Sequence, residues 1–218
     1  MAKRKSNKRE LILQLAMEMF DKSDYESVHM NKIAKSLGVS NGIIYYHFPT
    51  KQTLFYEMMN IYYIQAINDY LNDLEKYDLT TIIEFKKFFL KNTQDMFEKN
   101  YSLLRLIKIE NMTIDKGIDF SKIKTSREEI IRAHDKYVDK IVEKFQVFSK
   151  DEIMEIFYSR ASICLGYYFL YMEPKSGDNS NDPEKILQRK QIFQKKALQT
   201  FADYLDGVLQ KRNVDKLT

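Results

Sequence analysis

The chain has 218 residues, of which 44% are hydrophobic and 30% are charged, so it is long enough to bury a core and too apolar to be disordered. Six glycines and three prolines supply few hairpin turns, which argues against a mostly β fold. The single cysteine, Cys164, excludes an intramolecular disulfide, and the three histidines share no metal-ligand spacing. We therefore expect no metal and no cofactor. No uncharged apolar stretch of about 18 residues occurs, and a cytoplasmic protein without membrane contact is expected.

The excess positive charge is confined to the first quarter of the chain. Residues 1–51 contain nine Lys and Arg against five acids, whereas the other 167 residues contain 26 of each sign. A basic end on a neutral body indicates contact with a polyanion, although a solvated tail gives the same count. A basic arm at the very start consists of Lys3, Arg4, Lys5, Lys8 and Arg9. This arm either reaches into a DNA minor groove or stays a solubilising tail.

The spacing of apolar residues predicts helices nearly throughout, which makes the chain all-α with about nine helices and no strand. Three short helices are expected first: one over about Lys8–Asp21, one around Ile33–Leu37 that Gly38 ends, and one that Ser40 caps. Thr50 and Ser149 are placed to cap later helices. Those later helices are predicted at about 51–77, 80–98, 101–112, 121–147, 150–173 and 184–211. Loops are expected over Thr113–Asp119 and Pro174–Pro183.

Residues 29–55 have the pattern of a helix-turn-helix motif, in which the second helix lies in a major groove. Two short helices meet across Gly38, and the inward residues are Ile33, Ala34, Leu37, Val39, Ile44 and Phe48. The second helix leaves a polar and aromatic face outside the core, formed by Ser40, Asn41, Gly42, Tyr45, Tyr46 and His47. A plain helical hairpin gives the same apolar pattern, but two exposed tyrosines and no acid favour a binding face.

The segment IAKSLGVSNGIIYYHFPTKQTLF resembles the signature of the tetracycline-repressor (TetR) family of bacterial transcription regulators. The matching elements are Ile33-Ala34, Gly38-Val39-Ser40, Gly42, Tyr45, His47-Phe48, Lys51 and Leu54-Phe55. With the first helix included, the resemblance covers about residues 8–56. It implies a helix-turn-helix DNA-binding domain over residues 1–50. It also implies a helical effector-binding and dimerisation domain over residues 51–218.

The resemblance also assigns DNA contacts to individual residues. Asn41, Gly42 and Tyr45 would face the groove, Tyr46, His47 and Lys51 would lie near phosphates, and Asn31 would approach bases or backbone. Asn41 is suited to pair with adenine, although a solvated amide is the alternative, and His47 is alternatively a structural link between helices. The family usually has Thr or Ser where Val28 and His29 stand. Either Ser27 or His29 is expected to take over that cap.

The larger part of the chain is expected to bind an effector and a second subunit. The candidate ligand contacts are Phe89, Ile107, His134, Tyr137, Phe157 and Arg160. His134 and Arg160 interrupt apolar stripes and could orient a polar or acidic ligand, but a satisfied core histidine and a paired arginine give the same pattern. The candidate dimer contacts are Cys164, Gly166, Tyr168, Phe201, Tyr204 and Gly207. A glycine inside a helix costs about 1 kcal/mol relative to alanine, so these glycines indicate close backbone approach, either between subunits or within one.

Together these features predict a homodimeric repressor that a small-molecule effector releases from a palindromic double-stranded DNA operator. An activator with the same fold is an alternative. An all-α enzyme or carrier that uses the aromatic core is another alternative. It lacks sequence support, because no paired histidines, Cys-His arrangement, HExxH motif or glycine-rich phosphate loop is present. We therefore expect a regulator and not an enzyme.

Overall fold

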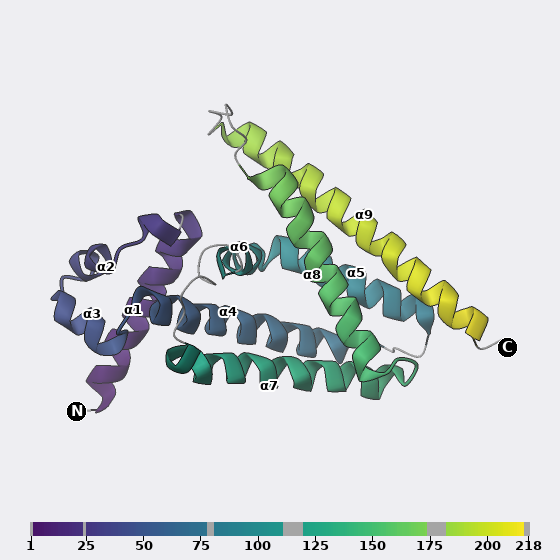
Figure 1. Cartoon of the computed structure of the whole chain (residues 1–218), viewed down its shortest axis with the longest axis horizontal. Coiled ribbons are helices and arrows are strands. Elements are labelled where there is room, and N and C mark those ends of the chain that lie inside the picture. Colours follow the sequence, from purple (N-terminus) through teal and green to yellow (C-terminus); the bar gives the residue numbers. More distant parts are fainter. Residues whose placement is uncertain (1, 24, 78–80, 111–119, 174–181, 216–218) are drawn as a thin grey trace. The chain divides into compact units, whose positions relative to one another are not determined.

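The computed structural model describes residues 2–23, 25–77, 81–110, 120–173 and 182–215, and within these ranges the chain is entirely helical apart from turns (Figure 1). Nine α-helices and one short 3-10 helix occur there and no strand, which confirms the predicted fold class. They are α1 (Ala2–Lys22), η1 (Tyr25–Ser27), α2 (Met30–Ser36), α3 (Asn41–His47), α4 (Lys51–Leu74), α5 (Ile82–Glu98), α6 (Tyr101–Ile109), α7 (Phe120–Phe145), α8 (Lys150–Met172) and α9 (Pro183–Asp215). None of the helices in these ranges is long and apolar enough to cross a bilayer.

Helix α1 differs most from the predicted boundaries. It begins at Ala2 and not near Lys8, so the backbone of the basic arm continues the helix and is not a separate tail. Alanine, lysine and arginine are good helix formers and no glycine or proline interrupts this segment, which explains the extension. Helix α4 ends at Leu74, before the predicted end at Tyr77, and α9 already begins at Pro183. The predicted loops at 113–119 and 174–181 lie outside the described residues.

The contacts of the backbone divide the chain into two compact units. The first contains residues 1–68 and 100–134, and the second contains residues 69–99 and 135–218. Helices α4 and α7 contribute residues to both units.

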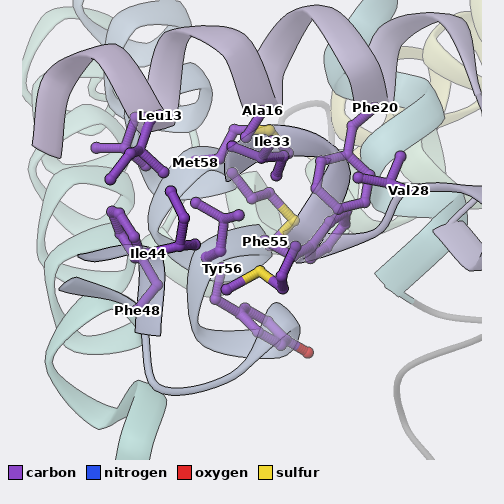
Figure 2. Packing of buried hydrophobic residues seen from close by; sticks show 14 of the residues in the cluster. Leu13, Ala16, Phe20, Val28, Ile33, Ile44, Phe48, Phe55, Tyr56 and Met58 are labelled. Atoms are coloured by element: carbon purple, nitrogen blue, oxygen red, sulfur yellow. The ribbon is translucent and has the colours of Figure 1, made fainter. Parts of the chain in front are cut away.

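The core of the first unit gathers α1, α2 and α3 on the first half of α4 (Figure 2). Ile44 of α3 and Phe48, which directly follows α3, are fully buried and join Ile33 of α2 and Phe55 of α4 in one apolar cluster. Rings pack edge to face there, with 5.3 Å between the centroids of Phe20 and Phe55. Burial of each such side chain stabilises the fold by about 1.5–3 kcal/mol, so α3 is held firmly by its apolar face.

The turn between α2 and α3 depends on a left-handed backbone at Gly38, where φ is 63°. The N–H of Gly38 donates to the carbonyl of Lys35 (3.2 Å), and the N–H of Val39 donates to that of Ala34 (3.0 Å). This pair of bonds is the Schellman ending of a helix, in which the left-handed residue is usually glycine. The predicted role of Gly38 is thereby confirmed.

The helix starts agree with prediction at two of three caps. The N–H of Thr53 donates to Thr50 Oγ1 (3.0 Å) at the start of α4, and Ser149 forms a reciprocal capping box with Glu152 at the start of α8. The cap predicted for the Ser40 side chain is wrong. Ser40 stands at the cap position of α3 with an extended backbone, but its hydroxyl makes no capping bond. The first backbone bond, from Ile43 N–H to the Ser40 carbonyl, starts the helix instead.

The second unit has an aromatic core with polar groups inside it. Helices α8 and α9 pack along each other and α5 packs on α9. Phe85 lies 4.3 Å from Phe145 and 4.6 Å from Phe148, measured between ring centroids. Within this core the buried Tyr137 hydroxyl donates to Asn92 Oδ1 (2.7 Å), and burial raises the pKa of Tyr137. The unit thus buries hydrogen-bonding groups that an entirely apolar core would not contain.

Gly38→Ala is expected to destabilise the protein by about 1–2 kcal/mol, because a side chain disfavours the left-handed backbone. A Cβ at this position meets nothing within 4 Å, so backbone strain is the whole effect. The matched control is Gly42→Ala, whose Cβ would make only an ordinary contact of 3.8 Å inside α3 and should leave stability unchanged or higher. Urea unfolding of both variants checks this, and equal midpoints for the two would contradict it.

Candidate nucleic-acid interface

Helix α3 presents a solvent-exposed face opposite its buried residues. Asn41 and Gly42 are exposed at its start, and Tyr45 and Tyr46 are 50% and 66% exposed in its middle. Side chains as large as tyrosine are usually substantially buried, so two exposed tyrosines on one short helix indicate a binding surface. The structure therefore brings these four predicted contact residues together on one face.

Helix α2 adds exposed polar and basic side chains. Asn31, Lys32 and Lys35 are exposed, while Ile33 and Ala34 on the same helix are buried. Lys32 and Lys35 were not among the predicted contacts, although their spacing of one helical turn in a basic segment was a usable signal. No acid occurs between Asn31 and Lys51, so this stretch attracts anions.

The replacement cap predicted at the start of α2 is not formed. His29 stands at the cap position, but its side chain makes no capping hydrogen bond, and Ser27 belongs to the preceding 3-10 helix. The apolar Val28, which is 1% exposed, packs into the core in between. That burial determines the position of the start of α2 without a side-chain cap.

Lys51 stands at the first position of α4 against the ring of Tyr25. Its ammonium nitrogen lies 4.0 Å from the ring centroid, a cation–π contact. Burial lowers the pKa of Lys51, partly opposed by the charge of Glu26. Burial also raises the pKa of Tyr25 to about 12, so the phenol stays neutral under the ammonium. The ring therefore orients Lys51 at a helix start, where the backbone dipole also attracts anions.

Arg9, from the basic arm, contacts two residues of the first unit. It forms an ion pair with Glu57 of α4, and its guanidinium lies 5.3 Å from the ring centroid of Phe48. These contacts join the first half of α1 to α4 and to the residue that follows α3. The sequence did not reveal this role, because the partners are far apart in the chain. Lys8 is exposed, and the side chains of Lys3, Arg4 and Lys5 lie outside the described residues.

His47 closes α3 in a partly buried position. Its ring packs edge-on against Tyr46 at 5.2 Å and lies 6.4 Å from Phe48, measured between ring centroids. This placement fits the structural alternative for His47. It also leaves the ring beside the exposed face of Tyr46.

The predicted ligand contacts fall into both units. Phe89, Tyr137, Phe157 and Arg160 come together in the second unit, where the Phe157 ring lies 5.4 Å from both Phe89 and Tyr137. The Arg160 guanidinium lies 4.8 Å from the Phe157 ring centroid. Ile107 and His134 are partly buried and belong to the first unit. Their role as ligand contacts stays a prediction.

The predicted dimer contacts divide by exposure. Cys164, Tyr168 and Phe201 are buried within this chain, and burial raises the pKa of the Cys164 thiol to about 12. Gly166 and Gly207 are exposed, and a Cβ at either one would meet nothing within 4 Å. The interpretation that these glycines serve close packing inside one subunit is therefore wrong. Close approach of a second subunit stays a prediction.

The buried helical scaffold, the tight turn and the exposed face of α3 together define a helix-turn-helix DNA-binding domain. Residues 12–58 match the profile of "Bacterial regulatory proteins, tetR family". The amino-terminal domain of this chain is therefore a helix-turn-helix domain of the TetR family.

Relatives with similar sequences carry related descriptions. The HTH-type transcriptional regulator QacR of Staphylococcus aureus is 27% identical over 133 residues, which cover 61% of this chain and 66% of that protein. The uncharacterized HTH-type transcriptional regulator YuxN of Bacillus subtilis is 35% identical over 33% of this chain and 24% of its own length. The HTH-type transcriptional regulator SAB2452 of Staphylococcus aureus is 36% identical over 36% of this chain and 47% of its own. The chain thus spans less than two thirds of each of these relatives, and the activity of the whole protein is a matter for proposal.

Proposed function

We propose that the protein is a ligand-responsive transcriptional repressor of the cytoplasm that binds a palindromic DNA operator as a homodimer. The exposed face of α3 carries this proposal, because it presents Asn41, Gly42 and Tyr45 from a helix whose other face is locked into an apolar core. A rigid, protruding helix with amide and aromatic side chains fits the major groove. The lysines of α2 and α4 that flank it supply contacts to phosphates.

A homodimer would present α3 twice. Two recognition helices separated by about 34–36 Å read successive major grooves on one side of the duplex, so the operator is a palindrome. Support for dimerisation comes from the open glycine positions Gly166 on α8 and Gly207 on α9, which leave room for a second backbone. A bound effector need only favour one spacing of the recognition helices, and a coupling of about 1–3 kcal/mol changes affinity roughly 5–150-fold. An activator of the same build would differ in where its operator lies relative to the promoter.

Asn41→Ala is expected to weaken operator binding and relax base preference at one position per half-site, by about 1–3 kcal/mol. The operator is first selected from random duplex DNA with the wild-type protein, and affinities are then measured by fluorescence anisotropy. Because Asn41 is exposed, stability should change by less than about 0.5 kcal/mol, which separates the loss from misfolding. Unchanged affinity and unchanged base preference would remove Asn41 from the contact surface.

Lys51→Ala is expected to weaken binding about equally on all sequences and to reduce the slope of log affinity against log salt by about 0.9, the value for one phosphate contact. The control is Lys136→Ala, which removes an exposed lysine from α7 in the second unit and should leave the slope unchanged. Titrations at several salt concentrations measure both slopes. An equal slope for wild type and Lys51→Ala would show that Lys51 contacts the Tyr25 ring and makes no phosphate contact.

Gly207→Leu is expected to convert the dimer to a monomer, because the added side chain would fill the space that a second backbone occupies. Within one chain the new Cβ has no neighbour within 4 Å, so the fold itself should persist. Lys136→Leu places the same side chain on exposed α7 and serves as the control. Sedimentation equilibrium gives the mass of each variant, and a Gly207→Leu protein that stays dimeric would exclude α9 at this position from the interface.

A further inference from the structure

Arg160 of α8 brings an unmatched hydrogen-bond donor into the aromatic core of the second unit. Its Nη1 is shielded from solvent and has no hydrogen-bond partner. Among the described residues no carboxylate lies within ion-pair distance of it, and the contact recorded for its guanidinium is the face of Phe157, at 4.8 Å. Arg160 as a whole is partly buried, and a shielded donor is normally paired. The alternative drawn from the sequence, an arginine paired with a neighbouring acid, is therefore not what the described residues show.

Asn92 of α5 supplies a second unmatched donor in the same core. The residue is fully buried, and its Oδ1 accepts a hydrogen bond from the Tyr137 hydroxyl at 2.7 Å. Its Nδ2 is shielded from solvent and has no partner. An amide nitrogen carries two donor hydrogens, so an acceptor is missing beside Asn92 Nδ2, as it is beside Arg160 Nη1.

Both donors lie around the same pair of aromatic rings. Tyr137 binds Asn92 through its hydroxyl, and its ring lies 5.4 Å from that of Phe157, over which Arg160 is placed. The positive charge of Arg160 partly opposes the burial that raises the pKa of Tyr137. The core therefore combines flat apolar walls with two donors that lack acceptors.

The same core offers less to a positively charged ligand. Asp73, whose charge also acts on Tyr137, is already bonded to Lys76 at 2.7 Å. Asp95 is the buried carboxylate among the described residues, and Lys91 and Lys99 already neutralise it, Lys99 at 3.3 Å. A cation would also be repelled by Arg160. The unmatched donors and the aromatic rings therefore favour an aromatic ligand that carries a hydrogen-bond acceptor.

We propose that the effector is an aromatic compound with an anionic acceptor group such as a carboxylate. Arg160 Nη1 and Asn92 Nδ2 donate to that group, and the ligand ring lies against Phe157 and Tyr137. A charge-assisted hydrogen bond is stronger than a neutral one and restores the partner that each donor lacks. The inference rests on the proposed function only for the ligand's effect on DNA; binding itself is measured without DNA.

Three naphthalene probes of matched size test the charge preference: 2-naphthoate, 2-naphthamide and 2-naphthylmethylammonium. Calorimetric titration of the full-length protein should show naphthoate binding about tenfold or more tightly than the ammonium probe. Arg160→Met should abolish that preference, whereas Arg160→Lys should keep part of it. The control Arg132→Met removes an exposed arginine from α7 and should change nothing.

A stability measurement guards against a misfolded variant. Arg160→Met removes an unmatched buried donor, so its thermal midpoint should equal or exceed that of the wild type. A marked drop in the midpoint would mean that the guanidinium has a structural partner, and the proposal would fall. It would fall equally if naphthoate failed to bind at millimolar concentration, if the ammonium probe bound as tightly, or if Arg160→Met left naphthoate affinity unchanged.

The DNA arm of the experiment separates this inference from the proposed function. Naphthoate that binds through Arg160 but leaves operator affinity unchanged supports the site and removes its regulatory role. If the protein binds its operator but does not bind naphthoate, the repressor function is supported and the proposed ligand class is wrong.

Discussion

The left-handed backbone at Gly38 is the constraint on which the DNA-facing surface depends. With φ at 63°, the chain turns out of α2 at Gly38 and the N–H of Val39 donates to the carbonyl of Ala34. Helix α3 then starts in the one direction that lets Ile44 and Phe48 enter the core. Since those two residues occupy one side of a short helix, the tyrosines on the other side are necessarily outside. The exposed face is thus a consequence of the turn and the core together.

The two units differ in the side chains that they bury. The first unit fills its core with aliphatic and aromatic side chains, and its buried Asn60 donates through Nδ2 to Glu129 Oε2 at 2.6 Å. Such a core holds the geometry of α3 rigid. The second unit instead keeps Asn92 and Arg160 among aromatic rings with donors unmatched. Unmatched donors cost stability, and they are the kind of cost that a binding site recovers from its ligand.

Helix α4 belongs to both units, which gives the proposed regulation a physical carrier. Its first half carries Lys51 and Phe55 in the first unit, and its second half carries Tyr70 in the second, stacked 6.0 Å from Tyr137. Under the proposed function, a ligand beside Tyr137 would change the surroundings of Tyr70 on α4.

The helices, most of their ends, the turn at Gly38 and the exposed face of α3 could be predicted from the sequence, because apolar periodicity and caps are local signals that neighbouring residues carry. It missed the helical backbone before Lys8 and placed a cap on Ser40 that does not form. Three contacts could be found only in the folded structure: Lys51 over the ring of Tyr25, Arg9 paired with Glu57, and the Tyr137 hydroxyl bonded to Asn92. These partners are 26, 48 and 45 positions apart, and such pairings follow from how helices pack and not from any pattern along the chain.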